Sequence, residues 1–181
     1  MAITDELTGL YNRRFFLNRL EWECERAKRY QRPLACLMID VNGFKQVNDR
    51  IGHHMGDLIL QQVAQELKTF LRQSDILARF GGDEFVVALP ETSASQAESV
   101  AEKLRQLAIP VPDGDKRGVP PVSLSVGLSR IEAERESPQD ILEAADRSLY
   151  TWKRHTSQQP ATSLPHATAS SQLNASLPSA S

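Results

Sequence analysis

Two adjacent carboxylates, Asp83 and Glu84, follow a glycine pair between two strand-like runs of sequence. The runs cover 76–80 and 85–89, and glycine tolerates the positive φ that a tight hairpin turn needs. Hard carboxylate oxygens beside bare backbone suit Mg²⁺ and phosphate. A solvated acidic turn explains this stretch equally well, because Gly-Gly-Asp turns are common.

A third carboxylate, Asp40, directly follows a continuous apolar run. The run covers 34–39, and its length and boundaries are typical of a buried strand rather than a helix. Sheet proteins often place ligand-contacting groups at the carboxyl end of such a strand. If this strand lies beside the hairpin, then Asp40, Asp83 and Glu84 converge, which is the hypothesis of a metal site.

The composition is that of an ordinary globular protein. The chain has 181 residues, a hydrophobic share of 40%, a charged share of 24% and a net charge of −2. This balance favours no nucleic-acid partner, and no apolar stretch reaches the roughly 20 residues of a membrane span. The start lacks a signal peptide, and Cys24 and Cys36 form neither a disulfide framework nor a metal pattern. We therefore expect a cytoplasmic protein with buried free thiols and no membrane segment.

Apolar periodicity and Pro and Gly residues divide the chain into one domain, 1–157, and a tail, 158–181. The tail has no Lys, Arg, Asp or Glu and too little apolar surface to offset the entropy of ordering, so we expect it to be disordered. The elements expected in the domain are a helix capped by Asn12 and running to about Tyr30, the strand ending at Asp40, a short helix over 42–51, a long amphipathic helix from Asp57, the hairpin, a helix over 93–107, a Pro/Gly-rich loop over 109–121, a half-buried strand over 122–128 and a last helix opened by Ser137 and Pro138. This order predicts an α/β or α+β sandwich with helices on a mixed or mainly antiparallel sheet.

Several separate motifs, in one order and spacing over residues 4–156, carry a resemblance to a known family. They are Asp5-x-Leu7-Thr8-Gly9-Leu10-x-Asn12-Arg13-Arg14, Asp40-Val41-Asn42-Gly43-Phe44-Lys45-x-x-Asn48-Asp49, Gly52-His53-x-x-Gly56-Asp57, Arg79-Phe80-Gly81-Gly82-Asp83-Glu84-Phe85, Ser125-Val126-Gly127 and Ala145-Asp146-x-x-Leu149-Tyr150-x-x-Lys153. Each motif alone is weak. Together they make the chain resemble a GGDEF domain, the catalytic module of diguanylate cyclases.

The resemblance implies condensation of two GTP molecules into cyclic di-GMP with release of two pyrophosphates. The implied fold is a mainly antiparallel five-stranded sheet with a βαββαβ core flanked by helices, similar to nucleotidyl cyclases and polymerase palm domains. Each domain would bind one GTP with two Mg²⁺ (or Mn²⁺) ions, so two domains must face each other as a homodimer. Such modules usually follow a sensory or receiver domain. Because the first motif begins almost at Met1, we expect either a piece of a longer protein or a domain that dimerises through another protein.

The same resemblance assigns roles to the acidic residues. Asp40, Glu84 and the backbone carbonyl of Val41 resemble ligands for Mg²⁺ on the triphosphate, with Asp83 at the second metal position. Such metal ions offset phosphate charge and lower the pKa of the attacking 3′-hydroxyl. Glu84 is also the residue considered as the general base, although a metal ligand and a base are hard to separate without kinetics.

The substrate-binding residues follow from the resemblance as well. Asn48 and Asp57 resemble a pair that reads guanine, because an amide and a carboxylate together match an edge that adenine lacks. Phe44 and Lys45 lie where backbone N–H groups and an ammonium reach the β- and γ-phosphates, and Lys45 belongs with Asp83 and Glu84 to the catalytic set. Lys153 resembles a phosphate-contacting lysine of the last helix.

Arg72 and Asp75 match the RxxD inhibitory site of the family, at the family's distance ahead of the glycine pair. In the family such a site binds the product, cyclic di-GMP, and stalls the enzyme. The second cation of this site is not assigned, and Lys103 and Arg105 are candidates for it.

The chain departs from the family pattern in two places. Asn42 stands where an aspartate is common, and Ser157 stands where the family usually has a phosphate-binding arginine. Because Asp40 is kept, metal binding should survive, whereas affinity for the triphosphate should be most affected. An active diguanylate cyclase is one hypothesis, and a domain that binds GTP or cyclic di-GMP without turnover is the alternative.

Other residues have structural interpretations. We expect His53 and His54 to be loop histidines rather than zinc ligands. The acidic pair in 113–115 predicts a turn rather than a calcium loop. Trp22 and Trp152 are interpreted as packing residues.

Overall fold

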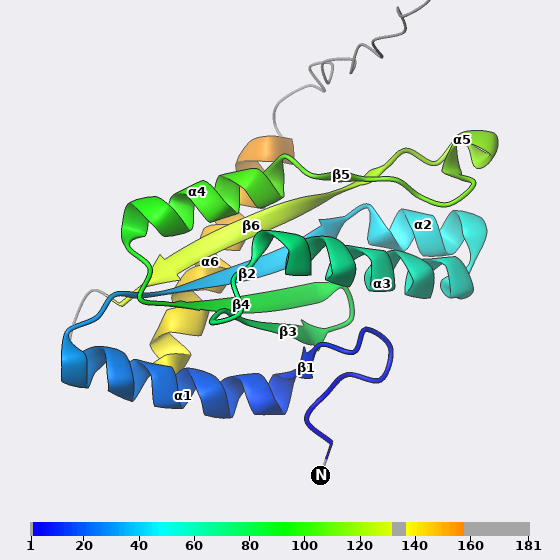
Figure 1. Ribbon diagram of the computed structural model, residues 1–181. Helices are drawn as coiled ribbons and strands as arrows, with labels where there is room; N and C mark the ends of the chain where they lie inside the picture. Colours follow the sequence, from blue (N-terminus) through cyan, green and yellow to red (C-terminus); the bar gives the residue numbers. More distant parts are fainter. Residues whose placement is uncertain (1, 132–136, 158–181) are drawn as a thin grey trace, which may run out of the picture.

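The computed structural model describes residues 2–131 and 137–157, so the tail predicted over 158–181 lies outside the described residues. The elements in Figure 1 are, in chain order, β1 (Tyr11–Asn12), α1 (Arg13–Tyr30), β2 (Leu34–Asn42), α2 (Phe44–Ile51), α3 (His53–Phe70), β3 (Ile76–Gly81), β4 (Glu84–Pro90), α4 (Ala94–Arg105), β5 (Ala108–Ile109), α5 (Gly114–Arg117), β6 (Val122–Arg130) and α6 (Pro138–Ser157). The predicted α/β order is confirmed, and the short elements β1, β5 and α5 are added to it.

One six-stranded sheet runs through the domain in the order β1-β3-β4-β2-β6-β5. All neighbouring strands are antiparallel except β1 and β3. The mainly antiparallel sheet is therefore confirmed, with six strands rather than five. The difference is small because β1 and β5 are edge strands of two residues each, too short to show a period in the sequence.

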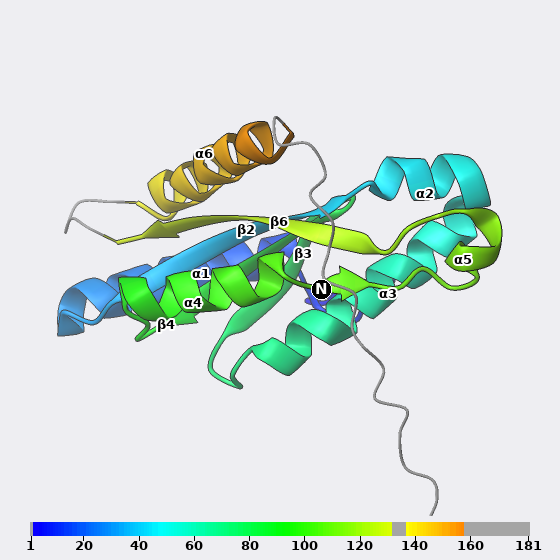
Figure 2. The ribbon, with the colours of Figure 1, turned by 90° about the horizontal axis from the view of Figure 1, so that it is seen from above.

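Helices cover both faces of this sheet. The core on one face comes from α1 and α6, and the core on the other face comes mainly from α3 and α4; Figure 2 shows α6 on the opposite side of the sheet from α3 and α4. Along β2, Leu37 and Ile39 belong to the second core, while Cys36 and Met38 belong to the first. A strand buried on both faces needs apolar residues at every position, which explains the continuous run. Cys24 and Cys36 are buried thiols that form no disulfide, as predicted.

Two helices begin at residues other than those predicted. β2 continues through Asn42, so α2 begins at Phe44 and not at residue 42, and Gly43 between them has a φ of +77°. α3 begins at His53 rather than at Asp57, and the histidine pair lies in its first turn rather than in a loop. In each case a glycine with positive φ precedes the helix, and such a residue separates elements without a change in hydrophobic pattern.

β6 is buried on both faces, whereas its alternating sequence predicts a half-buried strand. Ser125 and Ser129 are 3% and 7% exposed. Ser129 Oγ donates to the Ile141 carbonyl of α6 at 2.7 Å, and Ser125 Oγ donates to Asn42 Oδ1 at 2.7 Å. Because hydrogen bonds satisfy both hydroxyls, these serines are buried at little cost, and alternation is a poor guide to exposure here.

Gly127 allows α6 to approach β6 closely. A Cβ atom at this position would lie 2.2 Å from both the Ala145 carbonyl oxygen and the Leu149 backbone nitrogen. Because these are backbone atoms of a packed helix, we expect Gly127→Ala to lower the free energy of unfolding by about 3 kcal/mol in urea denaturation. Gly81→Ala is the control, since a methyl group there meets nothing within 4 Å. Equal losses in the two variants would contradict the close approach.

Candidate active site

The three carboxylates of the metal-site hypothesis lie on neighbouring backbone segments at one end of the sheet. β2 and β4 are antiparallel neighbours, and their ladder pairs Asp40 directly with Glu84. At the next position, the backbone N–H of Val41 donates to the Asp83 carbonyl oxygen at 3.3 Å. The hairpin therefore brings Asp83 and Glu84 beside Asp40.

The carboxylates influence one another electrostatically. Burial raises the pKa of Glu84, and the charges of Asp40, Asp83 and Asp146 raise it further against the opposing charge of Lys153. Burial and the charge of Asp40 likewise raise the pKa of Asp83. Clustered carboxylates with raised pKa values are typical of sites that bind a cation or transfer a proton.

Lys153 of α6 supplies one cation to this cluster, with its Nζ 2.7 Å from Asp40 Oδ2. Within residues 2–131 and 137–157, no three His, Cys, Asp or Glu side chains lie close enough together to hold a metal ion. The donor set still fits Mg²⁺ in its chemistry, because the carboxylates and the nearby carbonyl are hard oxygen ligands with excess negative charge. Direct binding of a divalent ion by Asp40 would require Lys153 to turn away from it.

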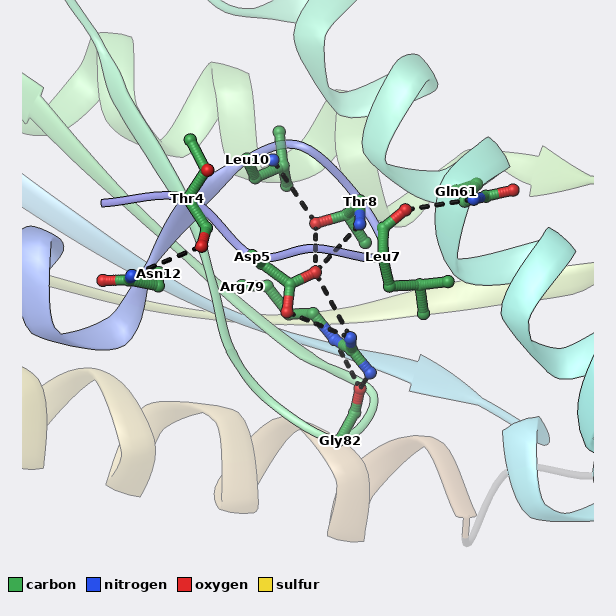
Figure 3. A network of polar contacts seen from close by, with 9 residues as sticks. All are labelled: Thr4, Asp5, Leu7, Thr8, Leu10, Asn12, Gln61, Arg79 and Gly82. Atoms are coloured by element: carbon green, nitrogen blue, oxygen red, sulfur yellow. Dashed lines mark hydrogen bonds and ion pairs between the residues drawn. The ribbon is translucent and has the colours of Figure 1, made fainter. Parts of the chain in front are cut away.

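Arg79 holds the turn that carries Asp83. Its Nε and Nη2 donate to the Gly82 carbonyl oxygen at 3.0 and 2.8 Å, and its Nη1 lies 3.2 Å from Asp5 Oδ2. Asp5 Oδ1 also accepts from the backbone N–H and the hydroxyl of Thr8, at 2.9 and 2.7 Å. Figure 3 shows these contacts linking the N-terminal segment to the hairpin. The motifs that contain Asp5 and Arg79 can both be identified in the sequence, but no sequence pattern predicts that these two residues contact each other.

Asp5 gives the fold a pH dependence. Burial favours its protonated form, but the hydrogen bonds from Thr8 and the charge of Arg79 outweigh it, so its pKa lies below the ordinary value of 3.8. A carboxylate with a lowered folded-state pKa stabilises the fold above its unfolded pKa, and this contribution is lost as the pH falls through the folded pKa. Asp5→Asn is therefore expected to cost about 1 kcal/mol at neutral pH, a value already reduced for solvent screening.

Urea denaturation across the pH range checks this expectation, because the deficit of Asp5→Asn should shrink as the pH falls below the ordinary value of 3.8 and through the lowered folded-state pKa. The control is Asp113→Asn, which removes an ion pair with Lys116 whose side chains are 82% (Lys116) and 56% (Asp113) exposed. It should change little at any pH. A deficit of Asp5→Asn that stays constant with pH would show that its charge is not the cause.

Asn48 lies against α3 with an unsatisfied amide. Its Oδ1 atom is buried and has no hydrogen-bond partner. A Cβ atom placed on Gly56 would lie 2.0 Å from this oxygen and 3.2 Å from Phe44 Cζ. A buried acceptor without a partner is costly in a folded protein. The position of Asn48 Oδ1 is therefore consistent with a hydrogen bond from a donor on a bound ligand.

The other predicted nucleotide contacts lie on the same helix pair. Asp57 is exposed in the first turns of α3, and Lys45 is exposed in the first turn of α2. No side chain caps the N-terminus of α2, where Gly43 is the capping residue. The backbone N–H groups there suit an anion.

A cavity of about 420 Å³ lies apart from the carboxylates, between the N-terminal segment, the end of α3 and the start of β3. Its lining residues are Gly9, Leu10, Tyr11, Lys68, Leu71, Arg72, Gln73, Asp75 and Leu77. Both residues of the RxxD motif therefore share one cavity. Neither Lys103 nor Arg105 lines it, whereas Lys68, which sequence reasoning did not single out, does.

Asp75 has an unsatisfied oxygen in this cavity. Its Oδ2 accepts from the backbone N–H of Arg72 at 2.8 Å, while its Oδ1 is buried without a partner. Burial raises the pKa of Asp75, against the hydrogen bond and charge of Arg72.

The two tryptophans differ in their surroundings. Trp22 is 52% exposed, and the guanidinium carbons of Arg19 and Arg26 lie 5.0 and 5.8 Å from its ring, so its interpretation as a packing residue is wrong. Trp152 is half-buried against Arg105 at 4.0 Å, which agrees with a packing role. Cation–π contacts with these two guanidinium groups explain why the Trp22 ring lies at an exposed position.

The family is shown by direct comparison. A family model described as "Diguanylate cyclase, GGDEF domain" matches residues 2–159. The chain therefore belongs to the family of diguanylate cyclase GGDEF domains, in agreement with the resemblance of its motifs.

Named relatives and solved structures agree with this assignment. The response regulator PleD of Caulobacter vibrioides is 36% identical over 155 residues, which are 84% of this chain and 34% of PleD. The solved GGDEF domain of TpbB (YfiN) from Pseudomonas aeruginosa is 37% identical with a TM-score of 0.75, over 84% of this chain and 89% of that chain. The GGDEF domain of DgcB from Caulobacter crescentus, solved with c-di-GMP, is 28% identical with a TM-score of 0.76, over 86% of this chain and 92% of that chain. This chain thus spans about a third of the curated relative.

Across the described residues, no helix is both long and apolar enough to cross a membrane.

Proposed function

We propose that this chain condenses two GTP molecules into cyclic di-GMP and releases two pyrophosphates. The observation that carries the proposal is the pairing of Asp40 with Glu84 across β2 and β4, next to the hairpin carboxylate of Asp83 and under Lys153. This arrangement places anionic oxygen ligands and one cation at one end of the two central strands. Family membership adds the reaction class to this chemistry.

Two Mg²⁺ or Mn²⁺ ions per GTP complete the site in this proposal. Asp40, Glu84 and the carbonyl of Val41 would hold one ion, and Asp83 would contribute to the second. Bound ions would supply positive charge that offsets the phosphates and lowers the pKa of the attacking 3′-hydroxyl. Glu84 is suited to hold a proton because its pKa is raised by burial and by the neighbouring carboxylates.

The substrate lies in this proposal between the carboxylates and the α2–α3 pair. Asn48 and Asp57 read the guanine edge, and the unsatisfied Oδ1 of Asn48 supports this role. Backbone N–H groups at Phe44 and Lys45 receive the terminal phosphates, with the ammonium of Lys45 beside them. Lys153, which contacts Asp40 in this structure, would contact the triphosphate if Asp40 held a metal ion.

Dimerisation follows from the stoichiometry. Cyclic di-GMP has two phosphodiester bonds, and each is formed when a 3′-hydroxyl attacks the α-phosphate of the other nucleotide. Two GTP-loaded domains must therefore face each other as a homodimer. We propose that a sensory or receiver domain in a parent protein brings them together, in the cytoplasm, where GTP is available.

Product analysis tests the proposed function. The chain fused to a dimerisation tag, freed of bound nucleotide and incubated with GTP and Mg²⁺, is expected to yield cyclic di-GMP and pyrophosphate. The same chain without the tag should be slower, because the two sites meet less often. A tagged dimer that binds GTP and makes no product would remove the enzyme proposal.

That outcome would support the second candidate, a domain that binds GTP or cyclic di-GMP without turnover. Ser157 at the end of α6, where the resemblance expects an arginine, favours this candidate. Calorimetry with each nucleotide separates the two functions, because binding without turnover supports the second and turnover removes it.

We also propose that the 420 Å³ cavity is a product-binding site that slows the enzyme. Arg72 and Asp75 contact cyclic di-GMP there, and Lys68 is the second cation. Arg72→Ala is expected to raise the concentration of cyclic di-GMP that halves the rate by about tenfold or more, because a hydrogen bond to a charged group is lost. The matched control, Arg117→Ala, removes an exposed arginine of α5 and should leave inhibition unchanged. Unaltered inhibition in Arg72→Ala would place the inhibitory site elsewhere.

A further inference from the structure

Arg105 joins α4, β6 and α6. Its Nε and Nη2 donate to the Val126 carbonyl oxygen at 3.2 and 2.9 Å, and its Nη1 lies 2.7 Å from Glu98 Oε1. The side chain is only 9% exposed. Its guanidinium carbon lies 4.0 Å from the centroid of the Trp152 ring. The guanidinium is therefore held by α4 and β6 and presents its face to α6.

The last turns of α6 have little burial of their own. Leu149 is 4% exposed, but no side chain in 150–156 is buried, and only Trp152 and Lys153 in this stretch are half-buried. Polar contacts such as those of His155 with the Thr151 carbonyl, at 2.7 Å, lie within the helix and do not anchor it. The stack of Trp152 on Arg105 is thus a contact that orients these turns against the sheet.

Lys153 depends on that orientation. It directly follows Trp152, and its Nζ lies 2.7 Å from Asp40 Oδ2. Neighbouring residues of a helix point about 100° apart, so a rotation or fraying at one moves the other. A metal ion on Asp40 would weaken the ion pair between Asp40 and Lys153. The stack of Trp152 on Arg105 would not be affected and would still orient the helix.

We propose that Arg105 and Trp152 are positioning residues that hold Lys153 over the substrate triphosphate. This inference rests on the proposed function. It deepens that function by naming what steadies the terminal helix in a chain with Ser157 in place of an arginine. Arg154 does not replace the missing arginine in this structure, because its guanidinium group lies over the ring of Tyr150, with the guanidinium carbon 5.8 Å from the ring centroid.

The test uses Trp152→Leu, which keeps an apolar side chain and helix propensity but removes the aromatic face. We expect the KM for GTP to rise about tenfold with kcat nearly unchanged, as loss of a partly desolvated cation–π contact implies. Trp152→Phe should restore the KM to near the wild-type value. Tyr150→Leu, which removes a 63% exposed ring on the same helix, is the matched control and should change nothing.

A double variant shows whether the effect passes through Lys153. In the Lys153→Met background, Trp152→Leu should add no further rise in KM, because the group it positions is absent. Additive effects in the double variant would overturn the inference. An unchanged KM in Trp152→Leu, or a lowered melting temperature as its sole effect, would overturn it too.

Hydrogen exchange gives a readout that needs no turnover. In the nucleotide-free protein, Trp152→Leu should make the amides of 153–156 exchange faster than in the wild type. Exchange of the amides near Ile141 should be unchanged. Equal exchange in the variant and the wild type would contradict the anchoring role. If the wild-type dimer makes no cyclic di-GMP, the proposed function is wrong. If the dimer turns over GTP but Trp152→Leu leaves the KM for GTP unchanged, only this inference is wrong.

Discussion

Glu84→Gln is expected to lower the rate of cyclic di-GMP formation by about 10³-fold, or about 4 kcal/mol of transition-state stabilisation. The substitution keeps the shape of the side chain but removes its charge. Glu84 faces Asp40 across the ladder, so the pair would lose half of its anionic charge at the metal position. The substitution also removes the carboxylate that is proposed as the general base. The measurement is product formation by the tagged dimer with saturating GTP and Mg²⁺.

A second measurement separates metal binding from folding. Binding of Mn²⁺ in the presence of GTP, followed by electron paramagnetic resonance, should weaken in Glu84→Gln while the melting temperature stays close to that of the wild type. Glu143→Gln is the control, because it neutralises a carboxylate of α6 that is 55% exposed and lies 3.8 Å from Arg147. A Glu84→Gln enzyme with more than a tenth of the activity and unchanged Mn²⁺ binding would refute this role.

Gly56→Ala is expected to raise the KM for GTP by about a hundredfold, because the guanine-reading amide would be displaced. The added methyl group would lie 2.0 Å from Asn48 Oδ1 and 3.0 Å from its Cγ. These atoms belong to a flexible side chain, so the amide moves and the helices do not need to. Gly56 is helical, and alanine favours a helix more than glycine does. The fold should therefore be kept while the base is bound poorly.

The control for this variant is Gln65→Ala, which creates the same residue at an exposed position of α3. It should leave the KM for GTP unchanged. Circular dichroism and urea denaturation should show Gly56→Ala to be at least as stable as the wild type. If Gly56→Ala keeps the wild-type KM, then Asn48 does not read the base from the position it occupies here.

Local patterns were enough to predict most of the fold. The apolar run before Asp40 predicted a buried strand, and the glycine pair before Asp83 predicted a hairpin, because both signals lie within a few residues. Periodicity also predicted the three long helices α1, α3 and α6, although α3 begins four residues before Asp57. The burial of Ser125 could not be predicted, since its hydroxyl donates to the amide oxygen of Asn42, which is 83 positions away in the sequence.

Separate motifs of the chain carried the residue types of the site, and family resemblance supplied their roles. The sequence did not show which of these residues touch. Asp5 and Arg79 are 74 positions apart, and nothing local pairs a carboxylate with a guanidinium at that distance. Asp146 and Lys68 were likewise without a site role until helix and strand placed them beside Glu84 and Arg72.

By itself, the sequence determined the carboxylates at the strand ends and the hairpin that carries two of them, because these follow from short-range pattern and turn chemistry. The class of protein followed from the order and spacing of several motifs that resemble those of a known family. Only the tertiary structure decided how Asp40 is partnered by Lys153, how Gly56 confines Asn48 and how Arg105 supports the last helix. The first and third of these contacts join elements distant in the chain, and the second depends on how two consecutive helices pack. Their geometry depends on how the helices pack on the sheet, and packing is a property of the whole domain rather than of any segment.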